Sequence, residues 1–318
     1  MSQGKPHWSG LGEAGTVLGM QILLQIHRFT GRWGFRIILW PVMTYYYLKH
    51  RDERINSAEY RHRFAQSNTD IQLGPAAGFR HFLSFGEAIL DKFLAWMNRI
   101  RRDDVIFADP QQVRSLDESA RGGILMVSHL GNIEISRALA YQLPGIRLTI
   151  LVYTQHAEKF NSLLRRLAPE SHIELLQVTD MSPAVAMMLS ERVDAGEYIV
   201  IAGDRTPVTG PQRTSPVQFL GHTARLPQGP YILASLLRCP ISTMFCLKQA
   251  GRYHIYLEPF ADAIRLPRKG RDAALTDLAQ QYADRLAFYC RRAPLQWFNF
   301  FSFWAGARER TRPATQGT

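Results

Sequence analysis

The stretch "GILMVSHLGNIE" (Gly123–Glu134) places a histidine and a carboxylate directly after a short apolar run. Further β-like apolar runs follow at residues 146–153, 173–178, 197–203, 240–248 and 253–260. Candidate helices alternate with them at Ile135–Tyr141, Ala157–Leu167, Pro183–Asp194 and Pro230–Leu237. Nearly continuous apolar strands separated by helices are typical of parallel sheets covered on both faces. The sequence therefore predicts an α/β fold with a mainly parallel central sheet flanked by helices.

The N-terminal part is apolar but interrupted by charge. Residues 15–48 carry Arg28, Arg32 and Arg36 at helical spacing, with Trp and Phe side chains beside them. Its uncharged runs are shorter than the ~20 residues that a spanning helix needs, and residues 1–15 lack the pattern of a signal peptide. The pattern favours a helix lying in the membrane interface; the alternative is a helix packed on the core with solvated arginines. We expect a membrane-associated segment at 1–54, an α/β domain at 55–304 and a disordered tail at 305–318.

The charge balance indicates an acidic partner. The chain has a formal net charge of +11, which suits an anionic membrane surface or an acidic carrier protein. Nucleic acid is disfavoured because the charges are dispersed and no recognition motif accompanies them. The cysteines Cys239, Cys246 and Cys290 have no metal-ligand spacing, so we expect buried, reduced thiols of a cytoplasmic protein.

His129 and Glu134 are five residues apart and would point away from each other on a straight helix. Gly131 and Asn132 suit a bend between them, and Asn132 is a good helix N-cap that would place Glu134 in the first helical turn. Glu134 would then accept a hydrogen bond from one ring nitrogen of His129, leaving the other nitrogen as a base. Without a GxSxG nucleophile motif, this predicts direct transfer of a group to a substrate hydroxyl or amine. The alternative is a structural histidine satisfied by a nearby carboxylate.

Two further clusters follow apolar runs. In "AGDRTPVTG" (202–210), Asp204 and Arg205 are candidates for holding a phosphate, a carboxylate or a developing oxyanion; alternatively they form a pair that fixes the loop. In "FLGHTARLPQGPYILA" (Phe219–Ala234), the glycines and prolines predict a loop, with Gly221, that opens a helix whose N-terminus faces an anion. No cluster has the spacing of metal ligands, so no metal or tightly bound cofactor is predicted.

The motifs "HLGNIE", "GDR" and "FLG…ARLPQGP", in this order, resemble the lysophospholipid acyltransferase superfamily, and most of all its late acyltransferases of lipid A biosynthesis. The closing "PLQWFNFFSFW" (Pro294–Trp304) is similar to that family's aromatic C-terminal block but lacks its usual charged residues. The opening "HWSGLGEAGT" (His7–Thr16) resembles a divergent branch linked to aryl polyene lipids. The resemblance covers residues 15–304. It implies that His129 is the catalytic base, that Glu134 is its partner and that the acyl donor is a thioester on acyl carrier protein.

Together these features predict a membrane-associated O-acyltransferase at the cytoplasmic face of the bacterial inner membrane, bound peripherally or monotopically. It would move a fatty or polyene acyl group from the carrier to a hydroxyl of a lipid or glycolipid. The residues expected to contact substrate are Asn132, Arg165, Asp204, Arg205 and Gly221, although a solvated helix face is the alternative for Arg165. Two other functions remain open: a thioester hydrolase, and a non-catalytic protein that binds lipid or acyl carrier.

Overall fold

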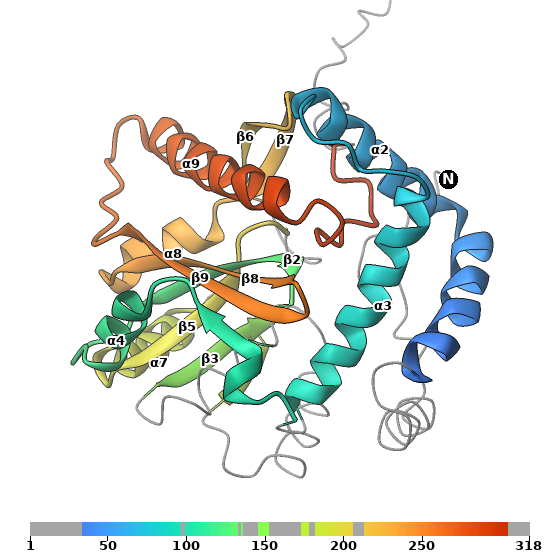
Figure 1. Ribbon diagram of the computed structural model, residues 1–318. Helices are drawn as coiled ribbons and strands as arrows, with labels where there is room; N and C mark the ends of the chain where they lie inside the picture. Colours follow the sequence, from blue (N-terminus) through green and yellow to red (C-terminus); the bar gives the residue numbers. More distant parts are fainter. Residues whose placement is uncertain are drawn as a thin grey trace, which may run out of the picture.

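A seven-stranded sheet forms the centre of the protein in a computed structural model of the chain (Figure 1). The structure describes residues 34–96, 99–132, 135, 146–152, 173–177, 182–205 and 213–304. The strands of the sheet are β1 (Val105–Phe107), β2 (Ile124–Gly131), β3 (Arg147–Val152), β4 (Ile173–Gln177), β5 (Glu197–Ala202), β8 (Ile241–Gln249) and β9 (Arg252–Ala261). Their order across the sheet is β1-β9-β8-β2-β5-β3-β4.

The pairing is parallel throughout this sheet except between β8 and β9. Each of the six apolar runs in the sequence forms a strand, so the predicted mainly parallel α/β sheet is confirmed. The exception has a local cause: β8 and β9 follow each other directly, and Ala250 and Gly251 between them both have positive φ angles. A turn this short can only return the chain antiparallel to itself.

Helices cover both faces of the sheet. They are an unlabelled helix over residues 34–49, α2 (Arg51–Ser67), α3 (Ala77–Trp96), the 3-10 turn η2 (Arg102–Asp104), α4 (Pro110–Asp117), α7 (Pro183–Asp194), α8 (Gly229–Leu237) and α9 (Arg271–Arg292). The α7 and α8 helices confirm the helices predicted at Pro183–Asp194 and Pro230–Leu237. The predicted helix at 157–167 lies outside the described residues, as does 135–141 apart from Ile135.

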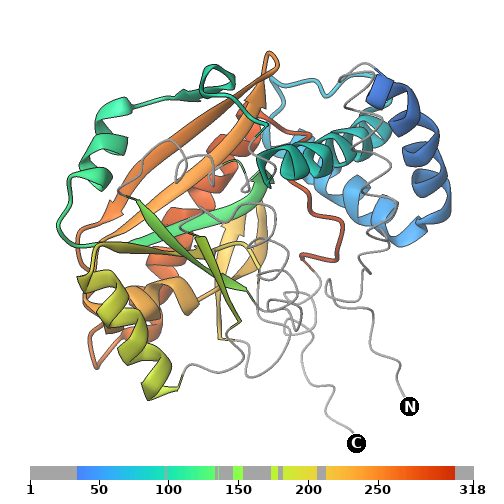
Figure 2. The same ribbon diagram turned by 90° about the horizontal axis from the view of Figure 1, so that it is seen from below.

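The central strand β2 explains why its sequence is apolar without interruption. Ile124 and Met126 belong to one buried cluster, with side chains of α7, α8 and α9. Leu125 and Val127 belong to a second cluster, with side chains of α3, α4 and the 34–49 helix. The helices that supply these side chains can be followed in Figures 1 and 2. Because both faces of β2 are buried, every position between Ile124 and Val127 must be apolar. All three cysteines are buried and free, as predicted.

The stretch 219–234 differs from the prediction of a loop that opens a helix. A hairpin precedes the helix, with β6 (Thr214–Phe219) antiparallel to β7 (His222–Pro227). Ser215, Val217 and Phe219 are buried while Pro216 and Gln218, which alternate with them, are exposed, so one face of the hairpin packs inward. Leu220 and Gly221 form its turn with positive φ angles, as two-residue hairpin loops require. The helical part of this stretch is α8, which begins at Gly229 after the hairpin.

The helix over residues 34–49, drawn in blue in Figure 1, packs on α3. Its buried side is formed by Phe35, Leu39 and Met43. The approach is close because Gly86 of α3 has no side chain: a Cβ there would lie 2.7 Å from Leu39 Cδ1. In the part of the chain that the structure describes, no helix combines the length and apolar character needed to cross a bilayer. Arg28 and Arg32 lie outside the described residues.

Candidate active site

The position of β5 beside β2 brings two predicted site residues together. The two strands are parallel, with Val127 opposite Ala202, so their carboxyl ends lie at the same edge of the sheet. His129 and Asp204 each follow two residues after this pair. Parallel sheets carry their sites at this edge, and the register therefore places an imidazole next to a carboxylate.

His129 and Asp204 make two hydrogen bonds. The Nδ1 atom of His129 lies 2.8 Å from Asp204 Oδ1, and the main-chain N–H of His129 donates to Asp204 Oδ2, also at 2.8 Å. The Asp204 side chain is 1% exposed and the His129 side chain is 34% exposed. The carboxylate therefore lies behind the imidazole, in the interior, while part of the ring reaches solvent.

The charges of this pair suit a general base. Burial is the largest effect on Asp204 and would raise its pKa, but the facing His129, its two hydrogen bonds and the nearby Arg205 together outweigh burial, so the pKa of Asp204 is lowered. Burial and the neighbouring Arg205 lower the pKa of His129 against the opposing effect of Asp204. At neutral pH the carboxylate is ionised and the imidazole is neutral. An ionised carboxylate only accepts hydrogen bonds, so Nδ1 carries the hydrogen and Nε2 keeps its lone pair.

Gly131 ends β2 in a conformation that requires glycine. Its φ angle is +76°, and a Cβ there would lie 1.9 Å from the carbonyl oxygen of Cys246 on β8. The next residue, Asn132, donates its main-chain N–H to that same carbonyl at 2.9 Å, and its side-chain Nδ2 donates to Ala88 of α3. These contacts tie the end of β2 to β8 and α3; the predicted bend toward Glu134 continues outside the described residues and stays a prediction.

The sequence did not identify the C-terminal aromatic segment as part of this site. Trp297 pairs with Leu130 in an antiparallel bridge, and its indole Nε1–H donates to Asp204 Oδ2 at 3.1 Å. The main-chain N–H of Phe298 donates to the carbonyl of His129 at 3.1 Å. The concentration of aromatic residues in Pro294–Trp304 indicates a buried segment, but nothing in this sequence predicts that it contacts β2.

Arg205 also faces the C-terminal segment. Its Nη2 donates to the carbonyl of Phe298 at 3.0 Å, and its guanidinium lies 5.0 Å from the centroid of the Phe301 ring. Burial lowers the pKa of Arg205 to about 10, so the group is still charged at neutral pH. This placement fixes a positive charge beside His129, where it disfavours the imidazolium form.

The remaining predicted residues are not part of this cluster as described. Gly221 lies in the β6–β7 turn, where a Cβ would be 3.1 Å from Ser67 Oγ of α2. Glu134 and Arg165 lie outside the described residues, so their predicted roles stay predictions. Within the described ranges, no three His, Cys, Asp or Glu side chains are grouped as metal ligands.

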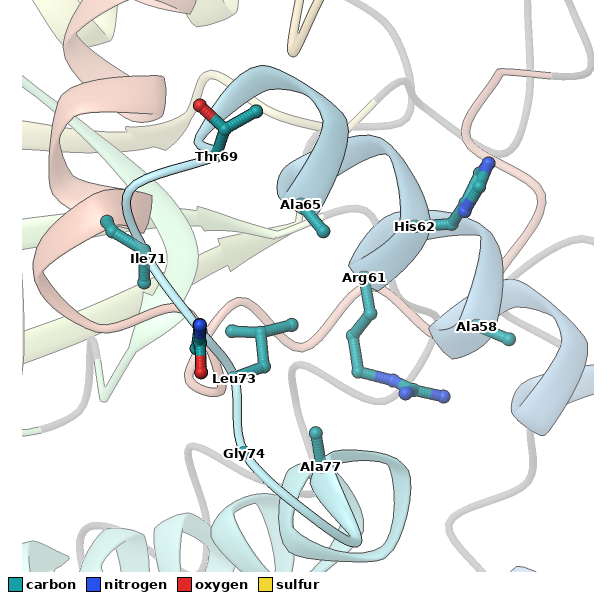
Figure 3. Close-up of a pocket in the computed structure, with 10 residues that line it drawn as sticks. Ala58, Arg61, His62, Ala65, Thr69, Ile71, Leu73, Gly74 and Ala77 are labelled. Atoms are coloured by element: carbon teal, nitrogen blue, oxygen red, sulfur yellow. The ribbon is translucent and has the colours of Figure 1, made fainter.

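A separate hollow of ≈ 660 Å³ lies between α2 and the start of α3 (Figure 3). Arg61 extends into it from α2, and Ile71 and Leu73 line it from the connecting segment. None of the predicted site residues lines this hollow, and no chemistry like that of the His129–Asp204 pair is present in it.

The fold and the base beside a buried carboxylate define a candidate acid–base catalyst of the α/β class. The chain matches the model of the bacterial lipid A biosynthesis acyltransferase family over residues 81–305. It belongs to this family, as the motifs predicted, and is therefore a lipid acyltransferase in the general sense. The matched region contains His129, Asp204 and Trp297 together. A comparison with curated proteins gave no match.

Proposed function

We propose that the protein transfers a fatty or related polyene acyl group from an acyl-carrier-protein thioester to a hydroxyl of a lipid or glycolipid at a membrane surface. The observation that carries this proposal is the hydrogen bond between His129 Nδ1 and the buried Asp204 carboxylate. It supports a base whose tautomer is fixed and whose second nitrogen is available. The family supplies the acyl chemistry, and His129 lies in the predicted "HLGNIE" motif.

The reaction needs one proton to be moved twice. His129 Nε2 takes the proton of the acceptor hydroxyl as its oxygen attacks the thioester carbonyl carbon. The tetrahedral intermediate then collapses, the carbon–sulfur bond breaks, and the imidazolium returns its proton to the departing thiolate. Asp204 stabilises the transient imidazolium from behind and holds the ring in one orientation. The products are the new ester and the free carrier thiol. Because Asp204 already holds Nδ1 of His129, Glu134 is proposed to take part in this proton transfer through the acceptor hydroxyl.

Transfer requires substrate-binding groups as well as a base. Arg205 carries a fixed positive charge next to His129, which favours binding of an anionic part of the donor or acceptor. The net charge of +11 supports an acidic donor such as acyl carrier protein, because opposite charges accelerate encounter. Asn132, Arg165 and Gly221 remain proposed contacts of the substrate.

The decisive experiment measures acyl transfer to a lipid acceptor from an acyl-carrier-protein thioester. We expect His129→Ala to lower kcat by on the order of 10²–10⁴-fold, the usual contribution of general acid–base catalysis. His254→Ala, on β9, is the matched control and should retain activity. Near-complete transfer by the His129 variant would remove this histidine from the mechanism.

Thioester hydrolysis is the second candidate, because an imidazole that is 34% exposed can be reached by water. Water would replace the acceptor hydroxyl and the same base would act. Thioester loss at the same rate with and without acceptor lipid would favour the hydrolase. Tight lipid binding with no turnover of any acyl thioester would instead favour a non-catalytic binding protein.

The proposed location is the cytoplasmic face of the inner membrane. The 34–49 helix is apolar on two opposite sides: opposite the buried Phe35, Leu39 and Met43, its outer side exposes Ile37, Trp40, Tyr45 and Leu48. At 100° per residue, these sets lie on opposed faces. Large apolar side chains exposed together on one helix face mark a contact with an apolar neighbour, and Trp and Tyr beside basic residues suit the bilayer interface.

Flotation with anionic phospholipid vesicles tests this location. Leu48 is 69% exposed on the outer side and Met187 of α7 is 65% exposed, so Leu48→Glu and Met187→Glu introduce the same charge at equally exposed positions. We expect only Leu48→Glu to weaken vesicle binding. Equal binding by both variants and the unaltered chain would rule out this face of the helix as the membrane contact.

A further inference from the structure

Two buried tryptophans lie close together in the C-terminal segment but differ in their hydrogen bonding. Trp297 and Trp304 are each 1% exposed, and their ring centroids are 6.1 Å apart. The indole N–H of Trp297 donates to Asp204 Oδ2. The indole nitrogen of Trp304 has no hydrogen-bond partner within the described part of the chain. Comparing substitutions of Trp297 and Trp304 therefore distinguishes the effect of indole packing from the effect of the N–H group.

The main chain around Trp297 is anchored to the end of β2. Gly131 donates its N–H to the carbonyl of Gln296 at 2.8 Å, and Phe298 donates its N–H to the carbonyl of His129 at 3.1 Å. On the opposite side, the carbonyl of Trp297 lies 2.9 Å from Nε2 of the buried His81. These contacts hold the indole in register with the strand that carries the base.

The indole completes the hydrogen bonding of the Asp204 carboxylate. Oδ1 faces the ring of His129, while Oδ2 accepts from the His129 main chain at 2.8 Å and from Trp297 at 3.1 Å. Two donors that approach Oδ2 from different chain segments fix the rotation of the carboxylate about its Cβ–Cγ bond. The orientation of Oδ1 toward Nδ1 depends on that rotation.

We propose that Trp297 is a positioning residue for His129, acting through Asp204. Its N–H group holds the carboxylate in the plane in which Oδ1 accepts the hydrogen of Nδ1, and this leaves Nε2 directed away from the carboxylate. Trp297 touches neither substrate in this role. The effect on turnover rests on the proposed function, whereas the effect on the His129–Asp204 hydrogen bond does not.

The test compares Trp297→Phe with Trp304→Phe in the full chain. Both substitutions shrink a buried indole, but only the first removes a donor to Asp204. We expect Trp297→Phe to lower kcat on the order of 10-fold, since a hydrogen bond to a charged group is lost, with KM for donor and acceptor nearly unchanged. Trp304→Phe should retain kcat. Thermal unfolding of both variants measures the packing loss separately.

A spectroscopic reading makes the outcome independent of turnover. In protein with isotope-labelled histidine, the Nδ1–H of His129 should give a downfield, slowly exchanging NMR signal, and Trp297→Phe should make this proton exchange faster. Replacing Trp297 with benzothienylalanine, which keeps the ring shape but has sulfur in place of N–H, covers the case in which the phenylalanine variant does not fold.

Equal loss of kcat in the two phenylalanine variants, with an unchanged His129 signal, would overturn the proposal and leave Trp297 a packing residue. If the unaltered protein transfers no acyl group but the His129 signal still responds to the Trp297 substitution, the proposed function fails while the positioning role stands.

Discussion

The buried histidine of α3 should make the protein lose stability in weak acid. His81 is fully buried; its Nδ1 lies 2.9 Å from Ser57 Oγ and its Nε2 lies 2.9 Å from the carbonyl of Trp297. Burial lowers the pKa of His81 from 6.5 to about 4. The neutral ring therefore donates from Nε2 to the carbonyl and accepts the serine hydroxyl at Nδ1.

The direction of the stability change depends on whether the folded or the unfolded chain binds the proton at the higher pH. Between pH 6.5 and about 4 the unfolded chain takes up a proton at this residue while the folded chain does not, so the free energy of unfolding falls as the pH is lowered. One pKa unit corresponds to about 1.4 kcal/mol. The difference between the two pKa values thus corresponds to a loss of about 3 kcal/mol, complete near pH 4 and absent above pH 6.5.

Urea denaturation followed by tryptophan fluorescence, at a series of pH values and constant ionic strength, measures this loss. His81→Gln removes the titrating ring, so its stability should fall by about 3 kcal/mol less than that of the unaltered protein between pH 7 and pH 4. Ser57→Ala is the control, because it removes one hydrogen bond but keeps the buried imidazole and therefore the steep pH dependence. Parallel pH curves for the unaltered protein and His81→Gln would refute the reasoning.

Further predictions concern the His129–Asp204 pair and Gly131. The acid limb of the pH–rate profile should have its midpoint below the ordinary His pKa of 6.5, since burial and then the nearby positive charge of Arg205 lower the pKa of His129; a midpoint above that value in steady-state kinetics would contradict the assigned charges. Asp204→Asn should lower kcat on the order of 10²–10⁴-fold with little change in KM, because an amide can hold the wrong imidazole tautomer. Gly131→Ala should cost about 2 kcal/mol or more in chemical denaturation, because φ is +76° and the added Cβ meets a backbone oxygen. Gly251→Ala, at φ +82° with no atom within 4 Å, should cost about 1 kcal/mol.

The sheet could be predicted because a strand that is buried on both faces has a continuous run of apolar residues. Every position of Ile124–Val127 is buried, and an apolar run this short, with glycines before it and polar residues after it, favours a buried strand over a helix. The apolar pattern of the β6–β7 hairpin is weaker, because only alternate residues such as Val217 and Phe219 are buried and Pro216 interrupts the pattern. From the sequence alone, the prolines and glycines there therefore predict a loop.

The partner of His129 could not be read from the sequence for a different reason. Apolar periodicity locates the end of each strand, but it does not say which strands are neighbours. Asp204 is 75 residues from His129, and Trp297 is 93 residues from Asp204. His129 and Asp204 meet because β5 pairs with β2 although β3 and β4 precede it in the chain, and Trp297 joins them through its bridge to Leu130. Local spacing could only suggest Glu134, which is near in sequence.

The occupied Nδ1 atom changes what the Glu134 hypothesis requires. Asp204 already accepts the hydrogen on Nδ1, so a carboxylate that orients the ring of His129 through its other nitrogen would have to use Nε2, the atom needed as the base. If Glu134 is catalytic, we therefore expect it to act on the acceptor hydroxyl or on a substrate cation and not to hold the imidazole. The two roles differ in the ground state: loss of the Asp204 carboxylate should disturb the imidazole tautomer without any substrate present, whereas loss of the Glu134 carboxylate should matter only once the acceptor is bound.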